Sequence, residues 1–362
     1  MTAPIIIAAG GTGGHLFPAE ALAAELTARG EPVALFTDAR SSAFASTAFA
    51  SAERFVLKGE GIAGRGMRRA ARGAMQLAAG TWQARAILKR LGARAVVGFG
   101  GYPAIPPALA ALSMGGGRPM LVLHEQNGVL GRVNQIFARR VAMVACGTWP
   151  TDLPAGVTAV HTGNPVRRAI LERAGAPYIP PGDYPMSILV IGGSQGARIL
   201  SDVVPPAISA LPEPIRRNVR VSHQARDEDM ARVAAYYADE GINADVQPFF
   251  NDIPHRMTDA QLVISRAGAS SIADISVIGR PAILIPLAIA IRDEQTANAA
   301  ALVAAGAAIL IPEPELEVAP LSLRIAEVLG DPDRALQMSL RALECGRPDA
   351  TERLVEIVEE LA

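Results

Sequence analysis

One pattern constrains the fold of this chain more than any other, and it occurs twice. A short apolar run, residues 5–8, leads into the glycine-rich turn of residues 10–14 (G-G-T-G-G) and then into apolar residues at helical spacing. Residues 188–191 lead in the same way into residues 192–196 (G-G-S-Q-G) and a second helical pattern. Strand, glycine turn and helix in this order begin a Rossmann-like unit, so we expect two such units.

The rest of each half continues to alternate strand and helix. A chain of 362 residues is longer than one hydrophobic core usually serves. The alternation predicts the α/β class, with two doubly wound parallel sheets covered by helices on both faces. Prolines crowd residues 162–185, which places the domains at residues 1–164 and 165–344, followed by an amphipathic helix within 345–362. Further strands are expected at residues 33–36, 95–99, 120–123, 141–145, 219–222, 262–265, 282–285 and 308–311.

Composition narrows the class of protein. No stretch offers the roughly 20 uninterrupted apolar residues that span a bilayer, and the N-terminus lacks the basic region of a secretory signal. Cys146 and Cys345 lack metal-ligand spacing. We therefore expect a soluble, reduced, cytosolic protein. Residues 61–124 contain nine Arg or Lys and no acidic residue, which suggests an anionic partner for the first half.

The first glycine turn favours anion binding, because amides at a helix N-terminus attract phosphate. A nicotinamide-binding turn would need a glycine where this chain has Leu16, so an oxidoreductase is disfavoured. Asp38 imitates a ribose-binding acid but is better interpreted as a turn residue. His15 starts the following helix, where the dipole keeps an imidazole neutral and able to accept a proton. A capping or packed histidine is the alternative.

Two polar segments follow strands of the first half, residues 98–103 (G-F-G-G-Y-P) and 124–128 (H-E-Q-N-G). Because parallel strands end at one edge of a sheet, both segments are expected to point into one cleft. Gln126 and Asn127 offer the donor and acceptor pairs that sugar hydroxyls require. The cluster of His124 and Glu125 is equally compatible with a structural role, in which the carboxylate pairs with the imidazole or with backbone amides.

The second half contains a comparable cradle. Residues 265–274 read as a strand end, a turn of small residues and a new helix. Asp274 lies about one turn into that helix, where a carboxylate can accept bonds from two ribose hydroxyls; a solvated helix acid is the alternative. Residues 293–298 (D-E-Q-T-A-N) add a polar cluster at another strand exit.

Together these segments resemble the MurG family, the transferases that complete the lipid-linked precursor of peptidoglycan. The matching motifs follow the family's order over nearly the whole chain, at residues 10–18, 98–103, 124–128, 163–167, 192–198, 265–274 and 295–298. The resemblance implies a GT-B fold, in which two Rossmann-like domains face a central cleft and the C-terminal helix returns to the first domain. It implies an inverting transfer of GlcNAc from UDP-GlcNAc to the 4-hydroxyl of the undecaprenyl-linked acceptor, lipid I, which gives lipid II. No cofactor and no essential metal are implied.

The resemblance also implies roles for individual residues. Arg167 and Ser194 would hold the diphosphate, and Gln295 would address the GlcNAc hydroxyls. The inverting reaction needs a group that removes the proton of the acceptor hydroxyl, and we assign this role of general base to His15. Asp274 stands where glutamate is common, so a ribose contact requires a small helix shift or a bridging water, and Glu294 stands where many members carry histidine or glutamine. The remaining donor contacts would be Thr12, Gly13, Gly14 and Asn127, the uracil-side Ile253, and the nucleotide-lining Ala269, Ser270, Ser271, Ile272, Ala273 and Asp274.

If the acceptor is a lipid, the basic region is expected to bind anionic headgroups at the cytoplasmic face of the membrane. The protein would then be a peripheral membrane protein. A solvated helix face is the alternative, and nucleic acid is not expected as a partner. Two other functions stay open: a UDP-GlcNAc 2-epimerase of the same fold, and a non-catalytic nucleotide-sugar-binding regulator at the membrane. The residues of this basic region are Arg65, Arg68, Arg69, Arg72, Arg85, Lys89 and Arg90, interleaved with Met67, Met75, Leu77, Trp82, Ile87 and Leu88.

Overall fold

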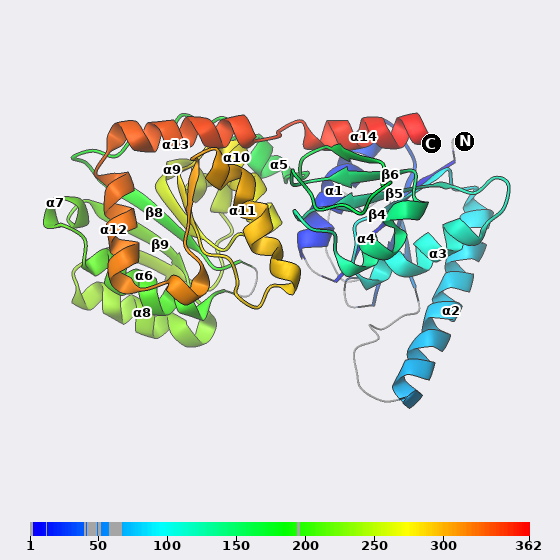
Figure 1. Cartoon of the computed structure of the whole chain (residues 1–362), viewed down its shortest axis with the longest axis horizontal. Coiled ribbons are helices and arrows are strands. Elements are labelled where there is room, and N and C mark those ends of the chain that lie inside the picture. Colours follow the sequence, from blue (N-terminus) through cyan, green and yellow to red (C-terminus); the bar gives the residue numbers. More distant parts are fainter. Residues whose placement is uncertain are drawn as a thin grey trace. The chain divides into compact units, whose positions relative to one another are not determined.

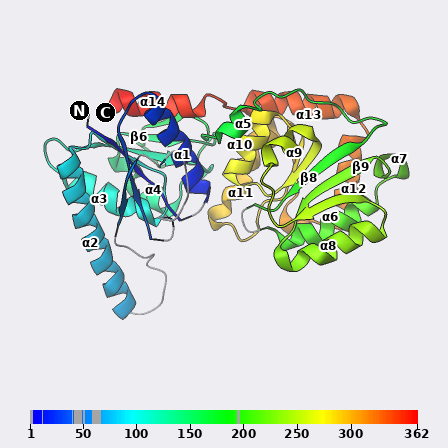
Figure 2. The same ribbon diagram turned by 180° about the vertical axis from the view of Figure 1, so that it is seen from behind.

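The computed structural model describes residues 3–11, 13–39, 41, 49, 52–57, 67–193 and 196–362. The side chains of residues 67–70 and 291 lie outside this description. The chain forms two compact units, the first made of Met1–Arg167 with Pro348–Ala362 and the second of Arg168–Arg347 (Figure 1). Each unit contains one sheet, and the same elements are seen from behind in Figure 2.

In the described part of the chain, the N-terminal unit has a seven-stranded sheet in the order β3-β2-β1-β4-β5-β6-β7, and every neighbouring pair is parallel. Its elements are β1 (Ile5–Ala8), α1 (Gly13–Ala28), β2 (Val33–Thr37), β3 (Glu53–Val56), α2 (Met67–Leu91), β4 (Ala95–Gly98), the 3-10 turn η2 (Tyr102–Ala104), α3 (Ile105–Ser113), β5 (Met120–Glu125), α4 (Arg132–Phe137), η3 (Ala138–Arg140), β6 (Met143–Cys146), β7 (Ala159–His161) and α14 (Ala350–Leu361).

Strand β1 shows why this sheet is covered on both faces. Ile5 and Ile7 are fully buried in one cluster with apolar residues of α1 and α14, and Ile6 and Ala8 are fully buried in another with residues of α2 and α3. Successive side chains of a strand point to opposite faces, so a continuous apolar strand needs helices on both sides. Figure 1 shows α2 extending outward from one end of this unit.

The C-terminal helix packs within the N-terminal unit. Leu354 and Val358 of α14 are fully buried in the cluster that contains α1, and Arg29 after α1 forms an ion pair with Glu359 at 3.2 Å. The apolar stripe of this helix therefore covers the same face of the sheet as α1.

In the described part of the chain, the C-terminal unit has a six-stranded parallel sheet in the order β10-β9-β8-β11-β12-β13. Its elements are α5 (Arg168–Leu171), β8 (Met186–Ile191), α6 (Arg198–Ser209), α7 (Glu213–Arg216), β9 (Val219–Gln224), α8 (Asp227–Asp239), β10 (Asn243–Gln247), α9 (Ile253–Asp259), β11 (Ala260–Ser265), α10 (Ala269–Ile278), β12 (Ala282–Leu284), η4 (Ile291–Asp293), α11 (Glu294–Ala304), β13 (Ala308–Leu310), η5 (Glu313–Glu315), α12 (Val318–Leu329) and α13 (Pro332–Cys345).

The predicted α/β class with two doubly wound sheets is confirmed, and each expected strand is present within a few residues. Three strands were not expected, namely β3, β7 and β10, and all three lie at sheet edges. Their residues are half-buried or exposed, so they lack the continuous apolar run that marks a central strand. Among the described helices, none combines the length and apolar character needed to cross a bilayer.

Replacing Leu354 with Ala is expected to lower the free energy of unfolding of the N-terminal unit by about 2–4 kcal/mol, because the substitution leaves a cavity between α14 and α1. Urea denaturation followed by circular dichroism measures this change. Leu323→Ala is the matched control, since Leu323 is a helical leucine that is 59% exposed. Equal effects of the two substitutions would show that α14 does not stabilise the core.

Candidate active site

One cluster of candidate site residues lies at the carboxyl edge of the N-terminal sheet, around the ring of His15. The turn after β4 packs directly on this ring. A Cβ atom added to Gly100 would lie 3.3 Å from Cε1 of His15, and one added to Gly101 would lie 3.6 Å from Nε2. Both glycines have positive φ, of 81° and 69°. The positive φ therefore favours glycine at both positions, and at Gly100 a side chain would also crowd the imidazole.

The glycine turn after β1 is held by a short chain of hydrogen bonds. The carboxylate of Asp38 accepts from the Ser41 amide at 2.7 Å, and the Ser41 hydroxyl accepts from the Gly11 amide at 2.7 Å. The interpretation of Asp38 as a turn residue is confirmed. Gly13 and Gly14 open α1, and Thr12 lies outside the described residues.

Glu125 organises the turn after β5. One carboxylate oxygen accepts from the amide and the side-chain nitrogen of Asn127, at 3.1 and 3.2 Å. The other accepts from the Gly131 amide at 2.7 Å and from Nδ2 of Asn134 at 2.9 Å. Glu125 is 2% exposed, so these four donors replace the water that a buried carboxylate loses. Glu125 therefore has the structural role that the sequence left open, in which its carboxylate pairs with backbone amides.

The turns after β4 and β5 are joined as expected. Nε2 of Gln126 donates to the Phe99 carbonyl at 3.1 Å, and Nδ2 of Asn164 donates to the Gln126 carbonyl at 3.0 Å. The carboxamide of Asn127 is oriented by its bond to Glu125. The predicted donor contact Asn127 therefore lies on a turn that is fixed against the one around His15.

Both histidines of this edge are neutral near pH 7. Burial lowers the pKa of His15 below its usual 6.5, while the Glu125 carboxylate and hydrogen-bonding groups of Phe99 and Gln126 act in the opposite direction. Burial lowers the pKa of His124, which is fully buried, to about 4. His15 is partly exposed, so it is the histidine that can meet a substrate. Among the described residues, its buried Nδ1 meets no hydrogen-bond partner.

The side chain of Arg167 contacts α1, the helix that contains His15. Its guanidinium lies 5.0 Å from the ring centroid of Phe17, which is two residues after His15 in α1. A cation over an aromatic face is attracted by the ring quadrupole. The predicted diphosphate contact Arg167 is thus held beside the first glycine turn.

A second cluster of candidate site residues lies at the carboxyl edge of the C-terminal sheet. Gln224, at the end of β9, accepts from the Gly192 amide at 3.1 Å and donates to the Gly193 carbonyl at 3.0 Å. A Cβ atom on Gly192 would lie 2.3 Å from the Ala197 nitrogen, so only glycine fits. Ser194, the other predicted diphosphate contact, lies outside the described residues.

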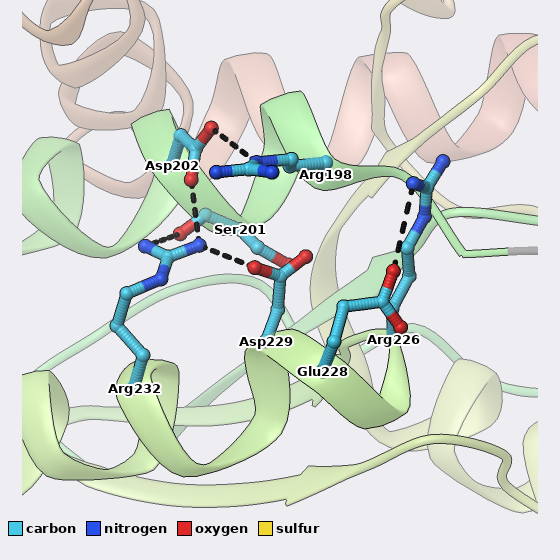
Figure 3. A network of polar contacts seen from close by, with 7 residues as sticks. All are labelled: Arg198, Ser201, Asp202, Arg226, Glu228, Asp229 and Arg232. Atoms are coloured by element: carbon cyan, nitrogen blue, oxygen red, sulfur yellow. Dashed lines mark hydrogen bonds and ion pairs between the residues drawn. The ribbon is translucent and has the colours of Figure 1, made fainter.

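A polar network holds the helix that follows this turn (Figure 3). Arg232 of α8 donates to Asp202 of α6 at 2.6 Å and to Asp229 at 2.8 Å, and Arg198 lies 3.6 Å from Asp202. The network therefore ties the first turns of α6 to α8. Figure 3 also shows Ser201 and the Arg226–Glu228 pair, whose charged atoms are 3.9 Å apart.

Helix α10 carries most of the predicted nucleotide contacts. It begins at Ala269, directly after Gly268, so its free amides face the carboxyl edge of β11. Asp274 is the sixth residue of the helix and is 9% exposed, so the alternative of a solvated helix acid is wrong. The other predicted contacts in α10 are Ser270 and Ser271, which are half-buried, and Ile272 and Ala273, which are buried.

Gln295 lies in the first turn of α11, close to the start of α10. Its Oε1 accepts from the Leu287 amide at 3.0 Å, and Nδ2 of Asn298 donates to the Ala267 carbonyl at 3.1 Å. The structure thus joins the turn that precedes α10 to the helix of Gln295. The predicted uracil-side contact Ile253 is the first residue of α9 and is half-buried.

Four polar residues that organise these edges were not singled out by sequence reasoning: Asn134, Gln224, Arg266 and Glu313. Asn134 follows Asn127 by seven residues and lies inside a helix, where no local pattern distinguishes it. Gln224 and Arg266 end or follow predicted strands, which is the one signal that could have found them. Among the described residues, no cluster of three or more His, Cys, Asp or Glu could hold a metal ion.

Both domains match family models of known glycosyltransferases. Residues 5–146 match the glycosyltransferase family 28 N-terminal domain and residues 187–354 match the glycosyltransferase family 28 C-terminal domain. The crystal structure of Acinetobacter baumannii MurG aligns with a TM-score of 0.79 and 28% identity, covering 99% of this chain and 100% of that chain. The kitacinnamycin glycotransferase aligns with a TM-score of 0.72 at 17% identity, which shows the fold alone. The protein is a glycosyltransferase with the GT-B fold.

Two curated relatives identify the family within this class of glycosyltransferases. The UDP-N-acetylglucosamine--N-acetylmuramyl-(pentapeptide) pyrophosphoryl-undecaprenol N-acetylglucosamine transferase of Granulibacter bethesdensis is 50% identical over 359 residues, which cover 99% of this chain and 93% of that protein. The protein of the same name from Rhizobium meliloti is 46% identical over 360 residues, covering 99% and 95%. The chain belongs to the MurG family, and the resemblance seen in the sequence is confirmed.

Replacing Glu125 with Gln is expected to destabilise the N-terminal unit by about 1–3 kcal/mol, because an amide –NH2 must then face one of the N–H donors that the carboxylate now accepts. Transfer activity should fall as the Asn127 turn loosens. Thermal denaturation and a transfer assay measure the two effects. Glu352→Gln on the exposed side of α14 is the control, and indistinguishable variants would contradict the role given to Glu125.

Proposed function

We propose that this protein transfers GlcNAc from UDP-GlcNAc to the 4-hydroxyl of the N-acetylmuramyl-pentapeptide of lipid I, forming lipid II with inversion at the anomeric carbon. The observation that carries the proposal is the 50% identity, over nearly the whole of both chains, with a transferase named for these substrates. Both carboxyl edges also carry residues suited to a nucleotide sugar: glycine turns, helix N-termini and oriented amides.

In this proposal His15 takes the proton of the acceptor hydroxyl. A neutral imidazole is required for this step, and burial favours the neutral form. As the ring becomes charged, the nearby Glu125 carboxylate stabilises it.

The donor is assigned to both units. Thr12, Gly13, Gly14 and Asn127 would contact it from the N-terminal edge, with Arg167 and Ser194 on the diphosphate. The developing charge of the leaving diphosphate would be met by these groups and by amides at helix N-termini, which are preorganised donors. Asp274 would address the ribose and Gln295 the GlcNAc hydroxyls. The remaining assigned contacts are Ile253, Ala269, Ser270, Ser271, Ile272 and Ala273.

We also propose that the protein binds the cytoplasmic face of the membrane through α2. Arg72, Met75, Trp82 and Lys89 recur at spacings that share one helix face, and all four are exposed, Met75 by 67% and Trp82 by 75%. This combination of basic and apolar side chains suits an anionic headgroup region.

Other members of the basic region are used within the protein. Arg85 donates to the Ser113 carbonyl at 2.5 Å, Arg90 pairs with Glu53 at 3.1 Å, and Leu88 is buried in the core. We therefore exclude these three from the proposed membrane surface. Arg65 and the side chains of Met67, Arg68 and Arg69 lie outside the described residues.

A transfer assay with radiolabelled UDP-GlcNAc and a short-chain lipid I analogue tests the enzymatic proposal. The wild-type protein is expected to make the lipid II analogue, and His15→Ala is expected to lower kcat by about 10²–10⁴-fold, as loss of a general base does. UDP affinity should stay within about twofold, because the imidazole acts on the acceptor. Since the base works deprotonated, wild-type kcat/KM should fall as pH drops through the lowered pKa, below 6.5.

The assay also separates the rival functions. Formation of UDP-ManNAc from donor alone would indicate a 2-epimerase, and donor binding without turnover in any mixture would indicate a regulator. Near-wild-type turnover of His15→Ala would refute the assignment of the base.

Vesicle sedimentation tests the membrane proposal. Binding to vesicles that contain anionic lipid should weaken as salt is raised, and Trp82→Ala should weaken it by about fivefold through lost apolar burial. Leu323→Ala removes an exposed apolar side chain from α12 and should leave binding unchanged. Salt-insensitive binding, or equal effects of the two substitutions, would contradict a surface centred on α2.

A further inference from the structure

An ion pair between a buried arginine and a half-buried glutamate links three strand ends of the C-terminal unit. Arg266, which follows β11, is 8% exposed and donates through Nη1 to the carbonyls of Ile285 and Pro286, both at 3.2 Å. The same nitrogen lies 2.5 Å from the carboxylate of Glu313, in the turn after β13. The pair therefore connects the ends of β11, β12 and β13 at the carboxyl edge.

The ion pair holds the segment between β12 and α11. Besides the two carbonyls bound by Arg266, the Ala288 amide donates to Glu313 at 3.3 Å. The Leu287 amide, between these contacts, donates to Oε1 of Gln295 at 3.0 Å. Four consecutive residues, 285–288, are thus each bound by a side chain from another element.

Strained backbone immediately before α11 is consistent with such a constraint. Arg292 and Asp293 have positive φ, of 58° and 51°, and neither is glycine. Conformations of this kind cost about 1–3 kcal/mol each and persist only where the surrounding structure imposes them. The anchored segment at residues 285–288 and helix α11 bracket this strained turn.

The anchored segment, residues 285–288, fixes which end of the Gln295 side-chain amide is free to contact a ligand. A backbone N–H can be met only by the carbonyl oxygen of a carboxamide, so the Leu287 contact fixes Oε1 and directs the –NH2 group away from Leu287. Gln295 therefore presents N–H donors. The hydroxyls and the acetamido carbonyl of GlcNAc are acceptors for such a group.

We propose that Arg266 and Glu313 are positioning residues that set the orientation of Gln295 toward the sugar of the donor. This inference rests on the proposed function, in which Gln295 addresses GlcNAc. The Arg266–Glu313 pair would thus act on recognition of the sugar, while other residues recognise UDP. Breaking the pair should therefore weaken binding of UDP-GlcNAc more than binding of UDP.

Glu313→Gln tests this assignment, because it removes the charge and leaves an acceptor oxygen of similar size. KM for UDP-GlcNAc is expected to rise by about tenfold, while the inhibition constant for UDP stays within about twofold, since only sugar contacts are misplaced. Glu315→Gln is the matched control: Glu315 is exposed in the same short turn and undergoes the same charge change. Thermal denaturation of both variants measures any general loss of stability.

A double-mutant cycle separates positioning from a purely structural role. Gln295→Glu keeps an acceptor for the Leu287 amide but replaces the N–H donors with a carboxylate oxygen. Its effect on KM for UDP-GlcNAc should not add to that of Glu313→Gln, because both act through the same contact. Additive effects, or parallel losses of UDP and UDP-GlcNAc affinity, would overturn the proposal.

The control variants distinguish failure of the positioning role from failure of the proposed function. If the wild-type protein transfers GlcNAc but Glu313→Gln behaves like Glu315→Gln, the positioning role is wrong and the proposed function stands. If the wild-type protein neither binds nor transfers GlcNAc from UDP-GlcNAc, the proposed function fails and the inference fails with it.

Discussion

Parallel pairing of every strand in the described part of the chain is the constraint on which the rest of this structure depends. In a parallel sheet all strands run in one direction, so each strand delivers the residues that follow it to the same edge. The turns after β1, β4 and β5 therefore meet around His15, and those after β8, β11 and β12 meet around the start of α10. Within each unit, candidate residues that are far apart in sequence share one sheet edge for this reason.

Each edge is then held by a buried charge that binds both backbone and side-chain groups. Glu125 accepts four hydrogen bonds in the N-terminal unit, and Arg266 binds two carbonyls and a carboxylate in the C-terminal unit. Burying a charge is costly unless such partners are supplied, so these residues impose one geometry on the turns around them. Turns fixed in this way can carry the glycine and amide contacts that a nucleotide sugar requires.

The chemistry assigned to His15 depends on the same arrangement. The ring packs on Gly100 and Gly101, and burial favours its neutral form, while Glu125 lies near enough to stabilise a proton once it is gained. His124 lies on the same edge but is fully buried, with a pKa near 4, and is unsuited to proton transfer with a substrate. Two histidines of one edge thus differ in exposure, and we assign proton transfer to the partly exposed one.

Central strands were the easiest elements to predict, because burial on both faces leaves an unbroken apolar run that any reader of the sequence can find. The edge strands β3, β7 and β10 were missed, since one-sided exposure removes that run. Asp38 was correctly interpreted as a turn residue, because a carboxylate so close to its own turn bonds locally. Asn134 could not be found in this way, since it lies inside a short helix, nine and ten residues after its partners Glu125 and His124, where no local pattern distinguishes it.

The sequence by itself determined the two Rossmann-like units, the family and the glycine turns, because these follow from local apolar runs, local backbone freedom and motif order. Only the tertiary structure decided that Gln126 bonds to the turn after β4, that Asp274 is buried, and that Arg266 and Glu313 hold the segment beside Gln295. These facts depend on residues that the chain brings together from different strands. Burial and hydrogen-bond saturation are properties of that assembled neighbourhood, and no window of the sequence contains it.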